Sequence, residues 1–241
     1  MFATMSLAEA ASPEIPLGQY VREGDSGTLT IRKDEQNRRT FEIKSIGANC
    51  HVCGVSGQVR GAIGRAGSGA GDGSDSTCDI SFAAGRSAVD VVPLTRDECR
   101  AYCGARAGFD GTYRVPSATC TSAGRRTQRD QSLRLYRSRR FSEAASKLRT
   151  LTEQCRPFMN WIEMDQVRND LALAQYHSGD FSQCLQTLSA TLAADVKDED
   201  ELKAGKGNTY LPPCDFDRYI DVAKSTWFNK ALCTKAISKG Q

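Results

Sequence analysis

Two cysteines separated by two residues, Cys50 and Cys53, are the side chains whose types and spacing most directly suggest chemistry. A C-x-x-C pair acts as a thiol–disulfide redox centre when a helix N-terminus stabilises one thiolate. Together with Cys99 and Cys103, the pair also has the ligand types of a four-thiolate zinc site, although the spacing is loose. The segment resembles a strand, in which the two Cα atoms would lie about 10 Å apart. We therefore favour structural disulfides and keep redox and zinc chemistry as alternatives.

Other catalytic arrangements find no support in the sequence. The two histidines, His51 and His177, are not part of a recognisable nucleophile motif. Carboxylates gather in the acidic run 195–201, which has no apolar surroundings to separate their pKa values. The glycine-rich segment 61–76 lacks the Gly-Lys-Ser/Thr ending of a P-loop, so we interpret it as a loop between strands. We predict no catalytic residue, cofactor or metal, and expect the chain not to be an enzyme.

The ten cysteines are divided six and four by a basic segment. Both counts are even, so we expect each half to close its own disulfides, as proteins do in an oxidising compartment. The six cysteines of the first half, whose pairing stays open, are Cys50, Cys53, Cys78, Cys99, Cys103 and Cys120. Residues 1–15 include the small-x-small pattern Ala8-Glu9-Ala10, which we interpret as the remnant of a signal peptide. The predicted location is therefore periplasmic or secreted.

Composition limits the partners. Hydrophobic residues make up 39% of the 241 positions and charged residues 25%, as in a soluble globular protein. No apolar run reaches the roughly 20 residues of a membrane helix, so no membrane span is expected. A net charge of +3 and few aromatics beside the basic stretch 123–149 argue against a nucleic-acid partner. That stretch predicts a solvated helix face or a docking surface for an acidic partner.

The elements that would position these residues differ between the halves, which predicts an α+β protein of two domains. Strand-like segments occur at 28–31, 41–43, 51–59, 78–82, 87–92 and 111–115. Their spacing predicts a small antiparallel β barrel or sandwich over residues 16–122. Thr95 and Glu98 have capping-box spacing ahead of a helical turn. A basic linker, 123–130, then leads to a helical domain, 131–241.

The helical half repeats with a period of 40 residues. Tyr136 corresponds to Tyr176, and Phe141 corresponds to Phe181. The residues of the second copy that form the pattern are Leu171, Ala174, Tyr176, Gly179, Asp180, Phe181, Cys184 and Leu188. This pattern resembles the tetratricopeptide repeat, whose period is 34 and whose first-copy Gly-Asp is replaced here by Arg139-Arg140. The resemblance implies stacked helical hairpins, with a closing helix over about residues 217–237.

Helix order in such an array constrains the last four cysteines. If the closing helix runs antiparallel to the helix before it, Cys233 reaches Cys184. The start of the closing helix would then bring Cys214 beside Cys155. We therefore predict the disulfides Cys184–Cys233 and Cys155–Cys214.

The first half more weakly resembles the Cys-rich β domains of periplasmic lysozyme inhibitors and of immunity proteins against cell-wall-attacking toxins. The residues that carry this likeness are 18–20, the cysteines on strands, and 109–113. The resemblance implies an exported protein-binding module that inhibits a secreted or periplasmic hydrolase by inserting a loop. The inserted loop would be either the glycine-rich segment 61–76 or the segment 99–109, in which the candidate contact residues are Arg100, Tyr102, Arg106 and Phe109.

Overall fold

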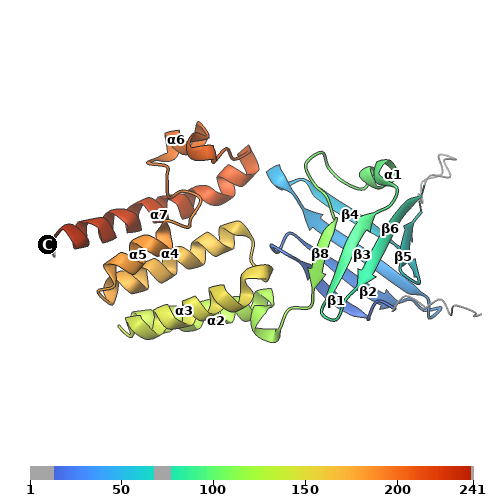
Figure 1. The fold of residues 1–241 in the computed structure, drawn as a ribbon, viewed down its shortest axis with the longest axis horizontal. Coiled ribbons are helices and arrows are strands. Elements are labelled where there is room, and N and C mark those ends of the chain that lie inside the picture. The colour runs from blue at the N-terminus through green and yellow to red at the C-terminus, as the bar shows by residue number, and fades with distance from the viewer. Residues whose placement is uncertain (1–13, 68–76, 240–241) are drawn as a thin grey trace, which may run out of the picture.

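A computed structural model describes residues 14–67 and 77–239 and shows a β-barrel followed by a helical array (Figure 1). The eight antiparallel strands close in sequence order. They are β1 (Gly18–Arg22), β2 (Gly27–Lys33), β3 (Arg39–Ile46), β4 (Val52–Arg60), β5 (Ile63–Ala66), β6 (Cys78–Ala84), β7 (Ala88–Pro93) and β8 (Gly111–Arg114). The α+β architecture is as predicted, and of the two predicted alternatives, barrel and sandwich, the strands form the barrel. The predicted signal-peptide remnant lies almost wholly outside the described residues.

Alternating side chains fill the barrel. Leu29 faces Ile43 and Ile31 faces Phe41 across β2 and β3, and all four side chains are buried. β5 lies inside the glycine-rich segment expected to be a loop, and residues 68–76 of that segment lie outside the description. At Gly64 of β5, an added Cβ would lie 2.4 Å from the ring of Phe82. Glycine is therefore a packing requirement on this strand, which explains why its composition resembled a loop.

The helical part contains two hairpins and a long last helix. Its helices are α2 (Ser122–Arg137), α3 (Phe141–Cys155), α4 (Trp161–His177), α5 (Phe181–Leu188), α6 (Glu199–Lys203) and α7 (Pro213–Lys239). Short 3-10 turns occur at η1 (Ala48–Cys50), η2 (Ala118–Cys120), η3 (Arg156–Phe158) and η4 (Lys206–Asn208). Phe141 and Phe181 begin the second helix of each hairpin, so the 40-residue period corresponds to one hairpin. No described helix is both long and apolar enough to cross a membrane.

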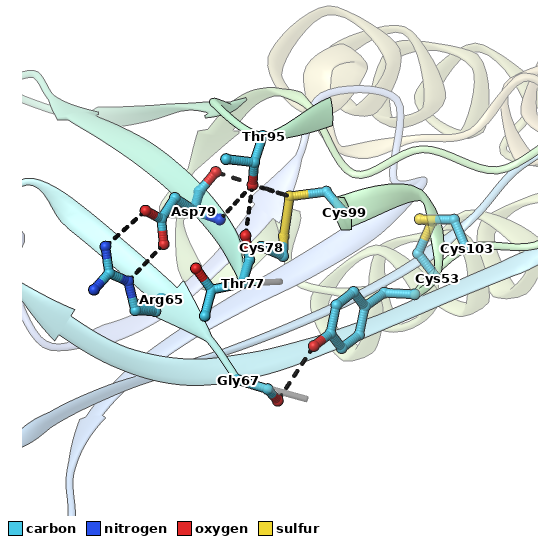
Figure 2. Close-up of a disulfide and its surroundings, with 10 residues drawn as sticks. Cys53, Arg65, Gly67, Thr77, Cys78, Asp79, Thr95, Cys99 and Cys103 are labelled. Atoms are coloured by element: carbon cyan, nitrogen blue, oxygen red, sulfur yellow. Dashed lines mark hydrogen bonds and ion pairs between the residues drawn. A yellow bond between two sulfur atoms is a disulfide. The ribbon is translucent and has the colours of Figure 1, made fainter. Parts of the chain in front are cut away.

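Two local predictions are wrong. Residues 123–130 are not a linker but the first turns of α2, because the Thr121 side chain accepts a hydrogen bond from Gly124 N–H and caps the helix. In α1 (Arg96–Arg100), Thr95 makes no side-chain cap. Its hydroxyl instead accepts from Asp79 N–H and donates to the Thr77 carbonyl, which ties α1 to β6 (Figure 2).

All ten cysteines are paired. The bonds are Cys50–Cys214, Cys53–Cys103, Cys78–Cys99, Cys120–Cys155 and Cys184–Cys233. The Cys184–Cys233 bond joins the start of α5 to the end of α7, as their antiparallel packing predicted. The predicted Cys155–Cys214 bond is wrong, and so is the expectation that each half closes its own bonds. The start of α7 and the end of α3 each meet residues of the first half instead.

A buried polar cluster joins α4 to α7. The Tyr219 hydroxyl donates to Asp165 Oδ2 at 2.8 Å and accepts from Ala193 N–H at 3.0 Å. Burial, with the carboxylate of Asp165 nearby, raises the pKa of Tyr219 far above its ordinary value. The phenol therefore remains the neutral donor that this cluster requires.

Replacing Tyr219 with phenylalanine is expected to lower the free energy of unfolding by about 2 kcal/mol, because the buried Ala193 N–H loses its acceptor and Asp165 Oδ2 keeps only its donor Leu192 N–H. Urea unfolding measures the change. Tyr210→Phe is the matched control, since Tyr210 is 67% exposed and should change stability little. Equal stability of the two variants would contradict the structural role of the Tyr219 hydroxyl.

Candidate binding groove between two parallel helices

A groove of about 780 Å³ lies between α2 and α4, which both run away from the barrel (Figure 1). Each of the two helices packs on α3, whose Ala144 and Leu148 line the groove between them. The side chains of each wall lie three or four residues apart along α2 or α4, so that they share one face of the helix. The polar and apolar side chains that characterise the two walls are Arg126, Arg129 and Leu133 of α2, and Gln166, Asp170 and Leu173 of α4.

At its barrel end the groove is closed by a buried arginine. Arg125 of α2 donates to both carboxylate oxygens of Glu163 on α4 and to Asp25 in the β1–β2 turn, each at 2.8 Å. A fourth hydrogen bond, to the Cys120 carbonyl, holds the guanidinium against the end of the barrel domain. The Arg125 side chain is 3% exposed. This single side chain therefore connects both groove walls to the barrel.

The charges at this junction are strongly coupled. Burial raises the pKa of Asp25, and Arg125 only partly offsets that effect. Burial disfavours the charged form of Arg125, but Glu163 and Asp25 outweigh it and raise the Arg125 pKa. At pH values between the ordinary pKa of Asp25 and its raised folded-state pKa, the folded protein binds the proton of this carboxyl more tightly than the unfolded chain does. The contribution of Asp25 to stability therefore increases as pH falls through its folded-state pKa.

Farther from the barrel, a second polar bridge spans the groove. Arg129 donates to Asp170 at 2.9 Å and to Gln166 Oε1 at 3.2 Å. The side chains of Arg129 and Asp170 are 31% and 49% exposed, so this bridge adds little to stability. Such a bridge can open to exchange its partner for a ligand group.

Two arginines in the groove are free to bind an anion. In the described parts of the chain, the ion pairs include neither Arg126 of α2 nor Arg218 of α7, and both side chains are exposed. Asp130 is the exposed carboxylate on the same wall. Toward the far end the lining becomes apolar, with Leu133 45% exposed and Leu173 half-buried opposite it. The groove thus offers cationic groups near the barrel and apolar contact beyond them.

The four contact residues predicted in the 99–109 segment have different surroundings. Arg100 and Arg106 are exposed, and Tyr102 is half-buried, donating its hydroxyl to the Gly67 carbonyl. Phe109 is 3% exposed in the barrel core, so its assignment as a contact residue is wrong. Its apolar ring is needed to fill the barrel. Cys78–Cys99 and Cys53–Cys103 anchor the segment to the strands (Figure 2).

The alternative cysteine sites are not assembled. Cys50 and Cys53 are bonded to Cys214 and Cys103, so the C-x-x-C pair does not close on itself. Cys99 is bonded to Cys78, so the four thiols proposed for zinc belong to three different disulfides. Within residues 14–67 and 77–239, no group of three or more His, Cys, Asp or Glu side chains is arranged to hold a metal.

The basic face of α2 was visible in the sequence, but the groove that it borders was not. The arginine-rich stretch predicted either a solvated helix face or a docking surface for an acidic partner, and no pattern in the sequence indicated that α4 lies opposite it. The signal available in the sequence is Leu133, which lies at helical spacing between Arg129 and Arg137. Asp25 could not be linked to Arg125 from sequence, because 100 residues separate them. No family model, curated protein or solved structure matches the chain.

Proposed function

We propose that the protein is an exported, disulfide-stabilised protein-binding module whose α2–α4 groove takes an extended acidic segment of another protein. The observation that carries this proposal is the pair of exposed arginines, Arg126 and Arg218, which line one groove beside the apolar Leu133 and Leu173. Carboxylates of a partner would bind the guanidinium groups, and an apolar side chain would bury against the leucines. Five disulfides support an oxidising compartment as the working environment.

The walls of the groove are held in place without a partner, so a partner would bind a preformed site and would not have to induce its folding. Cys120–Cys155 joins the 3-10 turn η2, which ends two residues before the first residue of α2, to the end of α3, and Arg125 ties α2 to α4. A preorganised groove avoids much of the conformational-entropy cost of association. The two-hairpin arrangement is consistent with the tetratricopeptide resemblance, which remains a proposal.

A secreted or periplasmic hydrolase remains the proposed partner class, with inhibition as the proposed outcome. One observation supports loop docking as a second mode of contact. The segment bearing Arg100 and Arg106 is anchored by two disulfides and exposes both guanidinium groups. A loop held in this way can enter a cleft without losing conformational freedom.

Peptide binding with charge-reversal variants tests the groove. A fluorescein-labelled peptide with several glutamates and one leucine should bind the wild-type protein, with affinity falling as salt rises. Arg126→Glu should weaken binding by about tenfold, because an attraction becomes a repulsion. Arg134→Glu is the matched control, since Arg134 is an exposed α2 residue outside the groove lining.

Fluorescence anisotropy measures these affinities, and a glutamine version of the peptide controls for charge. Equal weakening by Arg126→Glu and Arg134→Glu would show that binding depends on the general charge of α2 and not on the groove. Absence of binding to the wild-type protein would contradict the proposed function.

A further inference from the structure

The barrel caps the last helix. Cys214, in the first turn of α7, donates its N–H to the Asn49 side-chain oxygen at 3.1 Å. In return, Asn49 N–H donates to Asp215 Oδ2 at 2.8 Å. N–H groups in the first turn of a helix have no acceptor inside their own helix, and here a residue of the barrel supplies the acceptor. The Cys50–Cys214 disulfide, with 5.9 Å between the Cα atoms, lies beside this reciprocal contact.

This disulfide differs from the other four in accessibility. Both of its cysteines are partly exposed, whereas each remaining bond has at least one cysteine that is 3% exposed or less. Its barrel side also has an uncommon backbone, since Asn49 and Cys50 both have left-handed φ angles, +57° and +58°. Non-glycine residues adopt this conformation at a cost and keep it when the surroundings hold them. Accessible disulfides in such surroundings are the ones that external thiols reach first.

The next turn of α7 contributes to the groove. Arg218 lies one helical turn after Cys214 and is one of the two free arginines that line the groove. α7 packs along α4, which forms one wall. The position of this cationic group in the binding surface therefore depends on how the start of α7 is held.

We propose that Cys50–Cys214 is a reducible latch that regulates the groove through Arg218, an inference that rests on the proposed function. An external dithiol supplies the two electrons. Its thiolate attacks one sulfur to form a mixed disulfide and releases the other cysteine as a thiol. The second thiol of the dithiol then displaces the remaining cysteine, so that the dithiol is oxidised and both cysteines end as thiols. Loss of the covalent bond loosens the start of α7, which the hydrogen bonds of Asn49 to Cys214 and Asp215 still hold to the barrel.

Graded reduction of the intact, oxidised protein tests the latch without mutation. Dithiothreitol is added in steps, free thiols are alkylated, and peptide mass mapping identifies the labelled cysteines. Cys50 and Cys214 should be labelled at dithiol concentrations that leave the other eight cysteines unmodified. Labelling of any other pair first, or of all ten together, would overturn the proposal.

Hydrogen exchange and peptide binding of the selectively reduced protein test the coupling. Amides in the first turns of α7, through Arg218, should exchange at least about tenfold faster than in the oxidised protein. Affinity for the glutamate-rich peptide should fall about fivefold. Cys50→Ser/Cys214→Ser should reproduce both effects, whereas Cys184→Ser/Cys233→Ser, which lacks the bond at the far end of α7, should leave peptide affinity unchanged.

The outcomes separate the latch from the proposed function. Unchanged exchange around Arg218 after selective reduction overturns the latch, and so does equal peptide affinity in both redox forms. A protein that binds no acidic peptide in either form contradicts the proposed function. In that case the labelling order and the exchange rates still decide whether Cys50–Cys214 is reduced first and whether it loosens α7.

Discussion

Replacing Arg125 with alanine is expected to lower the free energy of unfolding by about 3 kcal/mol. The change removes the cation that pairs with both Asp25 and Glu163, and the side chains of these carboxylates are only 23% and 19% exposed. Two partly buried carboxylates are then left without a counter-charge, which costs more than the loss of the ion pair itself. Because a domain of this size is stable by only about 5–15 kcal/mol, the effect should be large in urea unfolding.

The neighbouring residue gives the control for Arg125. Arg126→Ala removes the same charge from an exposed site on the same helix and should change stability by less than about 0.5 kcal/mol. Adding Asp25→Asn and Glu163→Gln to Arg125→Met should recover part of the loss, since no unpaired charge then remains. A loss no larger for Arg125→Ala than for Arg126→Ala would show that the junction does not support the fold.

The loss caused by Arg125→Ala should also depend on pH. Burial already raises the pKa of Asp25 in the wild-type protein, and removal of Arg125 eliminates the charge that opposes this shift. The carboxyl of the variant therefore takes up its proton at higher pH, which relieves the unpaired charge. We expect the difference between variant and wild type to shrink as pH falls from about 7 to about 4. A difference that grows over this range would contradict the assignment.

Local patterns in the sequence identified most elements of the fold but not the contacts between its halves. Alternation around Leu29 and Phe41 indicated strands correctly, and the spacing of Cys184 and Cys233 on antiparallel helices indicated their bond. The strand β5 was missed because Gly64 is required by two aromatic rings, and glycine in sequence resembles a loop. The conformational preferences of neighbouring residues do not show that a glycine is needed for packing against side chains far away in the sequence.

The candidate groove was only half predictable for the same reason. The basic wall was visible as charge along α2, whereas its counterpart on α4 depends on how two hairpins pack. Even cysteine counts in each half suggested separate bonding, but Cys50 and Cys120 both bond to the helical half. An even number of cysteines shows that all of them can form disulfides. It does not show which cysteine bonds to which, because every complete pairing uses the same number of cysteines.

Removing the Cys120–Cys155 bond, as Cys120→Ala/Cys155→Ala, is expected to lower the free energy of unfolding by about 4 kcal/mol. The bond closes 35 residues, and the stabilisation follows from the smaller number of conformations left to the unfolded chain. Both cysteines are buried at the barrel end of the array, so the variant also leaves a small cavity. Thermal or urea unfolding of the purified variant measures the change.

A second disulfide variant distinguishes stability from the shape of the groove. Cys184→Ala/Cys233→Ala opens a loop of 49 residues and should lose a similar amount of stability, again about 4 kcal/mol. That bond, however, lies at the far end of α7, whereas Cys120 is two residues from the first residue of α2 and its carbonyl accepts from Arg125. We therefore expect only Cys120→Ala/Cys155→Ala to weaken binding of the acidic peptide as well. If both variants are equally destabilised and both bind normally, Cys120–Cys155 stabilises the fold without positioning the groove.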